Sequence, residues 1–179
     1  MLETLVSSKT RVKLLLKFFL NPDNRAHLRG LESEFGESSN AIRLELNKFE
    51  EADMLKSETE GNRKVFRANK KHPLFGDVQS LLRKYVGIDQ LVETVISRLG
   101  DVERVYLVGD FARGINSEII DLIIVGNVKE AYLFKLVKKA EEVLNKKVRF
   151  LIYSLEECTE KQPLNAESHK LVIWTKASK

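Results

Sequence analysis

A run of hydrogen-bonding side chains opens an amphipathic stretch in the N-terminal half of the chain. Arginine can form two parallel hydrogen bonds to guanine, and serine and asparagine can bond to base edges. The N-terminal end of a helix is the part that typically meets those edges in the major groove. The residues placed to do this are Ser38, Ser39, Asn40, Arg43 and Asn47. The pattern predicts a helix that contacts DNA bases; the alternative is a solvated polar face on a small helical domain.

A short basic segment follows this stretch and offers a second kind of contact. Glu60-Gly61-Asn62 has the composition of a hairpin turn, and Arg63 and Lys64 come directly after it. Cationic side chains bind the phosphate backbone without reading its sequence. We therefore expect Arg63 and Lys64 to increase affinity for DNA with little effect on specificity.

A glycine turn in the C-terminal half carries the other candidate site. Gly109, Asp110 and Arg113 follow one apolar run, and Asp121 stands inside the next. These four residues are the candidates for ligand binding. Asp121 is either a strand-end residue bonded to a turn or a metal ligand, and Arg113 is either a loop residue or an anion contact. A further alternative is an acidic site made by Asp110, Glu118 and Asp121.

The elements that must position these residues follow from the spacing of apolar side chains. Apolar residues three and four positions apart predict helices, and Ser7 or Ser8 can cap the first one. Short runs rich in branched residues predict strands. In the N-terminal half we expect a helix from about residue 9 to 19, a helix at 25–34, a turn at 35–37, a helix at 39–52, and a hairpin with strands near 54–55 and 64–67.

Two further helices are expected to link the halves of the chain. Pro73 can open the first, which carries an apolar stripe at 75–85, and Gly87 separates it from a second stripe at 91–99. These stripes predict a dimer contact. Beyond them we expect strands at 105–108, 119–125 and 148–153, a helix at 129–144, a mixture of short helix and loop at 154–170, and a strand or helical turn at 171–174.

Composition and charge narrow the class of protein. Residues 1–87 hold 16 Lys and Arg against 12 Asp and Glu, so the whole net charge of +4 lies in the N-terminal half. A modest basic excess fits phosphate contact. Cys158 is the only cysteine, and the histidines lack ligand spacing, so neither a disulfide framework nor a metal site is expected. The absence of a long apolar run and of a secretory signal pattern favours a cytoplasmic protein with no membrane segment.

The predicted order of helices and hairpin over about residues 5–70 resembles the ArsR-like winged helix-turn-helix regulators of bacteria. In that family a serine-rich start to the third helix precedes a leucine-containing run, here 46–55, and a basic wing with glycine at its tip. The resemblance implies a DNA-binding domain whose third helix reads sequence and whose wing contacts the backbone.

The C-terminal half, over about residues 88–155, resembles the minimal nucleotidyltransferase family. That family has a Gly-Ser turn that holds phosphates and three carboxylates that hold Mg²⁺. Here Gly109 matches the glycine, but Asp110 replaces the serine. Asp121 matches the second carboxylate, whereas Ile119 and Arg149 fall at the first and third positions. The resemblance therefore implies the family's fold without its catalytic residues, metal or cofactor.

These observations predict an α+β protein. It comprises a winged helix-turn-helix at 1–71, linker or dimerisation helices at 72–100, and an α/β nucleotidyltransferase-like domain with a small mixed sheet at 101–179. We expect a homodimeric, cytoplasmic transcription regulator that binds double-stranded DNA, with a small-molecule effector or protein partner as an option for the second domain. The alternatives are an active nucleotidyltransferase with a helical substrate-positioning module, and an antitoxin-like protein-interaction module.

Overall fold

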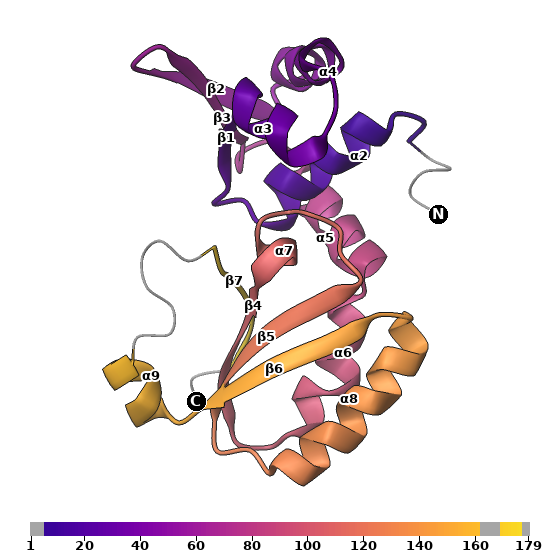
Figure 1. The fold of residues 1–179 in the computed structure, drawn as a ribbon, viewed down its shortest axis with the longest axis vertical. Coiled ribbons are helices and arrows are strands. Elements are labelled where there is room, and N and C mark those ends of the chain that lie inside the picture. The colour runs from indigo at the N-terminus through magenta and orange to yellow at the C-terminus, as the bar shows by residue number, and fades with distance from the viewer. Residues whose placement is uncertain (1–5, 162–168, 177–179) are drawn as a thin grey trace. The chain divides into compact units, whose positions relative to one another are not determined.

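The computed structural model describes residues 6–161 and 169–176 of the chain. It is a mixed α+β structure with two sheets, and it divides into two compact units, Met1–Tyr85 and Val86–Lys179 (Figure 1). The division falls inside the segment 72–100, for which the sequence predicted linker or dimerisation helices. The two helices of that segment therefore belong to different units.

Unit 1 contains the order of helices and hairpin that the sequence predicted, with one added strand. A three-stranded antiparallel sheet, in the order β1-β3-β2, lies beside the helices. Its elements are α2 (Lys9–Leu15), a π-helical turn η1 (Leu16–Leu20), β1 (Arg25–His27), α3 (Leu28–Phe35), α4 (Ser39–Glu51), β2 (Leu55–Glu60), β3 (Arg63–Ala68) and α5 (Phe75–Val86).

The prediction of a helix at 25–34 was wrong at its start. Residues Arg25–His27 form strand β1, and α3 begins only at Leu28. Strand β1 pairs with β3 so that Arg25 lies opposite Arg67. The backbone hydrogen bonds of these three residues are satisfied by a partner some forty positions away, which outweighs their local preference.

Local signals set both ends of the turn between α3 and α4. Gly36 ends α3 in the left-handed conformation, at φ 63°, where a side chain would be strained. The Ser38 hydroxyl accepts a hydrogen bond from the Ala41 backbone N–H at 3.3 Å and caps α4. The short connection thereby fixes where the predicted third helix starts.

The core of unit 1 is formed by apolar faces of these helices. Ile42, Leu46 and Phe49 of α4 are buried, as the helical spacing predicted. Phe19 packs against Phe49 and Phe75, with ring centroids 6.4 and 5.9 Å apart. Aromatic pairs at such distances add to the free energy gained from burial.

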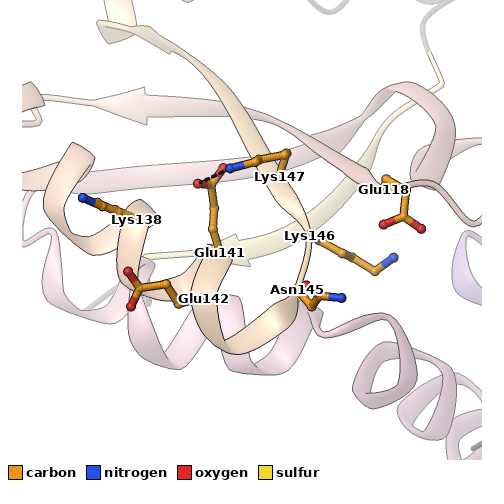
Figure 2. Close-up of a pocket in the computed structure, with 7 residues that line it drawn as sticks. All are labelled: Glu118, Lys138, Glu141, Glu142, Asn145, Lys146 and Lys147. Atoms are coloured by element: carbon orange, nitrogen blue, oxygen red, sulfur yellow. Dashed lines mark hydrogen bonds and ion pairs between the residues drawn. The ribbon is translucent and has the colours of Figure 1, made fainter.

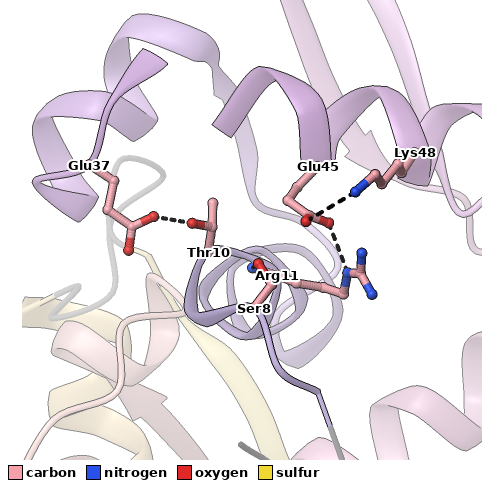
Figure 3. Close-up of polar contacts among 6 residues, drawn as sticks. All are labelled: Ser8, Thr10, Arg11, Glu37, Glu45 and Lys48. Carbon is pink, nitrogen blue, oxygen red and sulfur yellow. Dashed lines mark hydrogen bonds and ion pairs between the residues drawn. The ribbon is translucent and has the colours of Figure 1, made fainter. Parts of the chain in front are cut away.

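Ion pairs and hydrogen bonds join α2 to α4 and to the turn before it (Figure 3). Glu45, on α4, is 8% exposed and accepts a hydrogen bond from the Arg11 side chain at 2.8 Å. Burial raises the pKa of Glu45, but the hydrogen bonds and charges of Arg11 and Lys48 together outweigh it and hold the pKa below its ordinary value. Glu37 accepts from Thr10 and, at 2.5 Å, from Lys13. These contacts fix α4 on its inner side.

Unit 2 contains a mixed four-stranded sheet in the order β6-β5-β4-β7. Strands β5 and β6 are parallel, and the other neighbours are antiparallel. Its elements are α6 (Ile88–Thr94), a 3₁₀ turn η2 (Ile96–Arg98), β4 (Val102–Val108), α7 (Gly109–Ala112), β5 (Ile119–Gly126), α8 (Glu130–Leu144), β6 (Lys147–Tyr153), α9 (Leu155–Lys161) and β7 (Leu171–Thr175).

Helix α8 covers one face of this sheet with the apolar side chains that the sequence selected, including Leu133, Val137 and Ala140. Segment 171–174, expected as a strand or a helical turn, is strand β7. Helix α9 accounts for part of the expected mixture at 154–170, and residues 162–168 lie outside the described part of the chain.

The apolar stripe at 91–99 is buried against other elements of unit 2. Leu91, Val95, Ile96 and Leu99 are buried, and α6 packs on α8 and β7. This stripe is therefore not an exposed surface for a second copy. In the described residues no helix combines the length and hydrophobicity needed to span a membrane.

Candidate nucleic-acid interface

A concave surface in unit 1 brings together the start of α3, the outer face of α4 and the hairpin β2–β3. We refer to it as the basic groove, and its volume is about 680 Å³. Its lining residues are His27, Leu28, Arg29, Arg43, Leu46, Asn47, Asn62, Arg63, Lys64 and Phe66.

Four of the residues predicted to bind DNA line the basic groove. Arg43 and Asn47 are exposed and lie four positions apart on α4, so their side chains project from one face of the helix. Arg63 and Lys64 reach the groove from the start of β3. Two segments separated by a turn and a strand therefore present their polar side chains to the same space.

The remaining predicted contacts lie at the first turn of α4 and do not line the groove. The Ser38 hydroxyl is engaged in capping the helix. Ser39 is half-buried, and Asn40 is exposed. The structure thus gives the Ser38 hydroxyl a local structural contact and leaves the exposed Asn40 side chain without such a role.

Sequence reasoning missed the contribution of the segment that begins with β1. His27 and Arg29 line the groove, although neither was among the candidate residues. A signal was present, because Arg25, His27 and Arg29 alternate with apolar residues at the period of a strand. The expectation of a helix over this segment concealed it.

Lys64 is held by contacts within the hairpin and α4. Its ammonium group donates to Glu50 at 2.6 Å and lies 5.1 Å from the centre of the Phe66 ring. The hydrogen bond from Lys64, followed by one from Ser57, lowers the pKa of Glu50. Among the described residues, by contrast, Arg29 and Arg43 form no ion pair. The arginine charges in the groove are thus more available than that of Lys64.

The glycine turn of unit 2 lies against Asp121. Gly109 has φ 65°, and Val108 pairs with Asp121 across strands β4 and β5. A Cβ atom on residue 109 would lie 2.5 Å from Oδ2 of Asp121. The turn therefore requires glycine both for its backbone conformation and for the close approach of the carboxylate.

Arg149, on the neighbouring strand β6, forms hydrogen bonds with the Asp121 carboxylate. The two residues are opposite each other in the parallel pair β5–β6. Arg149 donates from Nε to Oδ1 at 2.6 Å and from Nη2 to Oδ2 at 3.0 Å. The hydrogen bond to Asp121, the charge of Asp121 and, more weakly, the charge of Asp110 raise the pKa of Arg149. This is a bidentate arginine–carboxylate pair.

The residues at this turn do not fit Mg²⁺. Ile119 lies opposite Lys147, and Asp121 lies opposite Arg149. The strand pair therefore provides one apolar side chain, two cationic side chains and a single carboxylate that is already paired. Mg²⁺ needs oxygen ligands in a strict octahedral arrangement. The described residues contain no group of three or more His, Cys, Asp or Glu side chains placed to hold a metal ion. The alternative acidic site of Asp110, Glu118 and Asp121 is therefore not formed.

Glu118 lies instead at a hollow of about 420 Å³ at the C-terminal end of α8 (Figure 2). The hollow is lined by Glu118, Lys138, Glu141, Glu142, Asn145, Lys146 and Lys147. Glu141 accepts hydrogen bonds from the Val148 backbone at 2.9 Å and from Lys147 at 3.4 Å. The glutamates and lysines that line the hollow compensate one another's charge, which distinguishes the hollow from the basic groove. Arg113 lies elsewhere, exposed at the end of α7.

Comparisons with known proteins give distant likenesses only. No family model matches the chain, and no curated protein matches it. The solved structure of AF1382 from Archaeoglobus fulgidus is 20% identical, with a TM-score of 0.39, over 48% of this chain and 97% of its own. The adhesin competence repressor AdcR from Streptococcus pyogenes is 13% identical, with a TM-score of 0.38, over 51% of this chain and 72% of its own.

A tri-AMPylated HEPN toxin in complex with MNT antitoxin, from Shewanella oneidensis, gives a match of 12% identity and TM-score 0.39, over 52% of this chain and 73% of the matched chain. The neighbours thus include both a repressor and a toxin–antitoxin complex. At these TM-scores and identities they assign neither a fold nor a function to this chain.

Proposed function

We propose that the protein is a DNA-binding transcription regulator in which unit 1 acts as a winged helix-turn-helix. Helix α4 is the recognition helix, and the hairpin β2–β3 is the wing. The observation that carries the proposal is the basic groove, where Arg43 and Asn47 of α4 share one concave surface with Arg63 and Lys64 of the wing. This arrangement can place base-reading and phosphate-binding groups on one duplex at the same time.

The charge of the groove supports the same proposal. Its lining includes three arginines and a lysine and no carboxylate. The hollow of Figure 2, in comparison, has three glutamates among its seven lining residues. A surface of one sign attracts a polyanion, whereas a mixed surface does not. A duplex, which carries a charge on every phosphate, matches the groove.

For unit 2 we propose a nucleotidyltransferase-like domain that has lost catalysis and serves ligand binding, partner binding or dimerisation. The supporting contact is the pair of Arg149 with Asp121, because an arginine neutralises the carboxylate that a metal would need. A homodimer interface is also proposed in unit 1, at α5 and the segment before it, where Leu74 and Leu81 are 55% and 41% exposed. Exposed leucines of this kind can bury themselves against a second copy.

A selection of random duplexes by the purified full-length protein tests the main proposal. We expect an enriched sequence, and a two-fold symmetric one with half-sites about one helical turn apart if a dimer binds. The matched control is Lys139→Ala, which removes one positive charge from an exposed position on α8. It should select the same sequence, whereas Arg43→Ala should not. A random output with the wild-type protein would overturn the regulator proposal.

A further inference from the structure

The contact between His27 and the wing is unusual because of the chemistry of its two atoms. Nε2 of His27 lies 3.3 Å from Nη1 of Arg63. The Gly30 backbone N–H donates to the other ring nitrogen, Nδ1, at 2.9 Å. A backbone N–H can only donate, so Nδ1 must be the accepting nitrogen. In a neutral imidazole the proton is then on Nε2.

Two donors consequently face each other at this point. The guanidinium group of Arg63 carries only N–H donors and cannot accept the proton of Nε2. The two groups therefore form no hydrogen bond with each other, and both need an acceptor. Two nitrogens 3.3 Å apart can both reach one oxygen at ordinary hydrogen-bond length, about 2.9 Å from each.

The backbone places both residues before any ligand binds. His27 is the last residue of β1, pairs with Val65 of β3, and caps α3. Its ring packs on Gly30, where an added Cβ would lie 3.2 Å from Cε1. Arg63 is the first residue of β3 and pairs with Glu60. Because β1 and β3 are hydrogen-bonded neighbours, the sheet holds the backbones of the two residues close to each other.

We propose that His27 and Arg63 form a clip for a single backbone phosphate of DNA, and this inference rests on the DNA-binding function proposed for unit 1. A phosphodiester has negatively charged oxygens that accept from both donors at once. The groove supplies no carboxylate of its own to take that role. The clip spans the start of α3 and the wing, so that one phosphate contacts both elements.

Two substitutions at His27 separate the clip from the helix cap. Asparagine is a preferred capping residue and can accept from Gly30 N–H, but it lacks a donor at the position of Nε2. Glutamine can place an amide donor near that position and caps poorly. We expect His27→Asn to weaken binding about tenfold, as for loss of a hydrogen bond to a charged group. His27→Gln should keep most of the affinity while lowering the melting temperature.

The experiment measures affinity of the full-length protein for the selected duplex by fluorescence anisotropy, with unfolding followed by circular dichroism. Arg63→Gln should also weaken binding about tenfold, and the double variant with His27→Asn should fall well short of a hundredfold loss, because both donors serve one phosphate. Replacing phosphates one at a time by neutral methylphosphonate should reveal a position that weakens the wild type and leaves the double variant unaffected.

The outcomes distinguish the clip from the proposed function. Wild-type binding that is unchanged in His27→Asn would overturn the clip alone. Equal loss in His27→Gln and His27→Asn would assign the effect to the helix cap and would also overturn it, as would full additivity of the two substitutions. Failure of the wild-type protein to bind any duplex would overturn the regulator proposal and the clip together.

Discussion

The basic groove of unit 1 and the glycine turn of unit 2 both place an arginine where a phosphate could bind, but only the arginine at the glycine turn is paired with a carboxylate. In the groove, Arg43 is exposed and, among the described residues, forms no ion pair. At the glycine turn, Arg149 is committed to Asp121 by two hydrogen bonds. An arginine without a partner offers its full charge to a ligand, whereas a paired one must first give up its carboxylate. The comparison favours the groove over the glycine turn as the proposed surface for binding DNA.

The largest effect that could break this comparison is catalysis by unit 2. We expect no Mg²⁺-dependent transfer from any labelled nucleoside triphosphate to protein, RNA or a small acceptor. Without metal ligands the charge of the transition state has no support, which costs orders of magnitude in rate. Transfer can be followed by label incorporation with the full-length protein.

The control for that experiment is Asp121→Ala, which should leave DNA binding intact. Robust transfer that disappears in this variant would refute the view that the turn is inactive. The pairing of Arg149 with Asp121 would then have to open during catalysis.

The second prediction concerns the close packing of the turn. Gly109→Ala places a Cβ 2.5 Å from the Asp121 carboxylate and requires an alanine at φ 65°. We expect a loss of about 2–5 kcal/mol in the free energy of unfolding of unit 2, from backbone strain of about 1–2 kcal/mol and overpacking of about 1–3 kcal/mol.

Gly100→Ala is the matched control, because Gly100 has φ 80° with no atom near its added Cβ. It should show the backbone strain alone in urea denaturation. If the two variants are equally destabilised, the carboxylate is not held against the turn as described.

The sequence predicted the parts of both regions that depend on local signals. The Ser8 cap of α2, the apolar spacing of α4 and the Gly61 turn each depend on residues close together in sequence, and each was confirmed. Strand β1 was missed because its hydrogen bonds come from β3. The resemblance to the nucleotidyltransferase motif placed Arg149 near the third carboxylate position. The sequence did not indicate that Arg149 would bind Asp121, because that contact depends on the register of two parallel strands.

The third prediction sharpens the role of the free arginine. Arg43→Ala should cost about 1–3 kcal/mol on the selected site and relax preference at one or two base pairs. The measurement is a titration of the selected duplex and of its single-base variants. Lys139→Ala should change neither quantity. Unchanged specific affinity in Arg43→Ala would count against α4 as the recognition helix.

A fourth prediction uses the carboxylates that hold α4. Burial raises the pKa of Glu37 and Glu45. The hydrogen bonds and charges of their partners, chiefly Lys13 and Thr10 for Glu37 and Arg11 for Glu45, lower both pKa values below the ordinary value of 4.5. A lowered folded-state pKa contributes stability that is present above pH 4.5 and is lost as pH falls through the folded-state value. Unit 1 should therefore lose stability in this acidic range.

Urea denaturation at a series of pH values checks this dependence. Glu45→Gln should flatten it, because one linked proton is removed. Glu51→Gln, at an exposed position of the same helix, should not. An identical pH dependence in the wild type and Glu45→Gln would mean that the Arg11–Glu45 contact contributes nothing to folding.

The smallest expected effect distinguishes the two basic residues of the wing. Each phosphate contact by a cation contributes about 0.9 to the slope of log affinity against log salt. Neutralising Arg63 and Lys64 together should flatten the slope by up to about 0.9 for each of the two contacts. The structure makes their shares unequal, because Lys64 is paired with Glu50 at 2.6 Å and must leave that partner to reach a phosphate.

Arg63→Gln should therefore reduce the slope by about 0.9, and Lys64→Gln by less. Glu50→Gln provides the converse test, since removing the carboxylate frees Lys64 and should steepen the slope. Titrations at several salt concentrations measure all three variants against the wild type. Equal slopes in the wild type and both wing variants would place the hairpin away from DNA. A steeper slope in Glu50→Gln would show that pairing with a carboxylate, the feature that separates Arg149 from Arg43, limits how much charge a side chain offers to DNA.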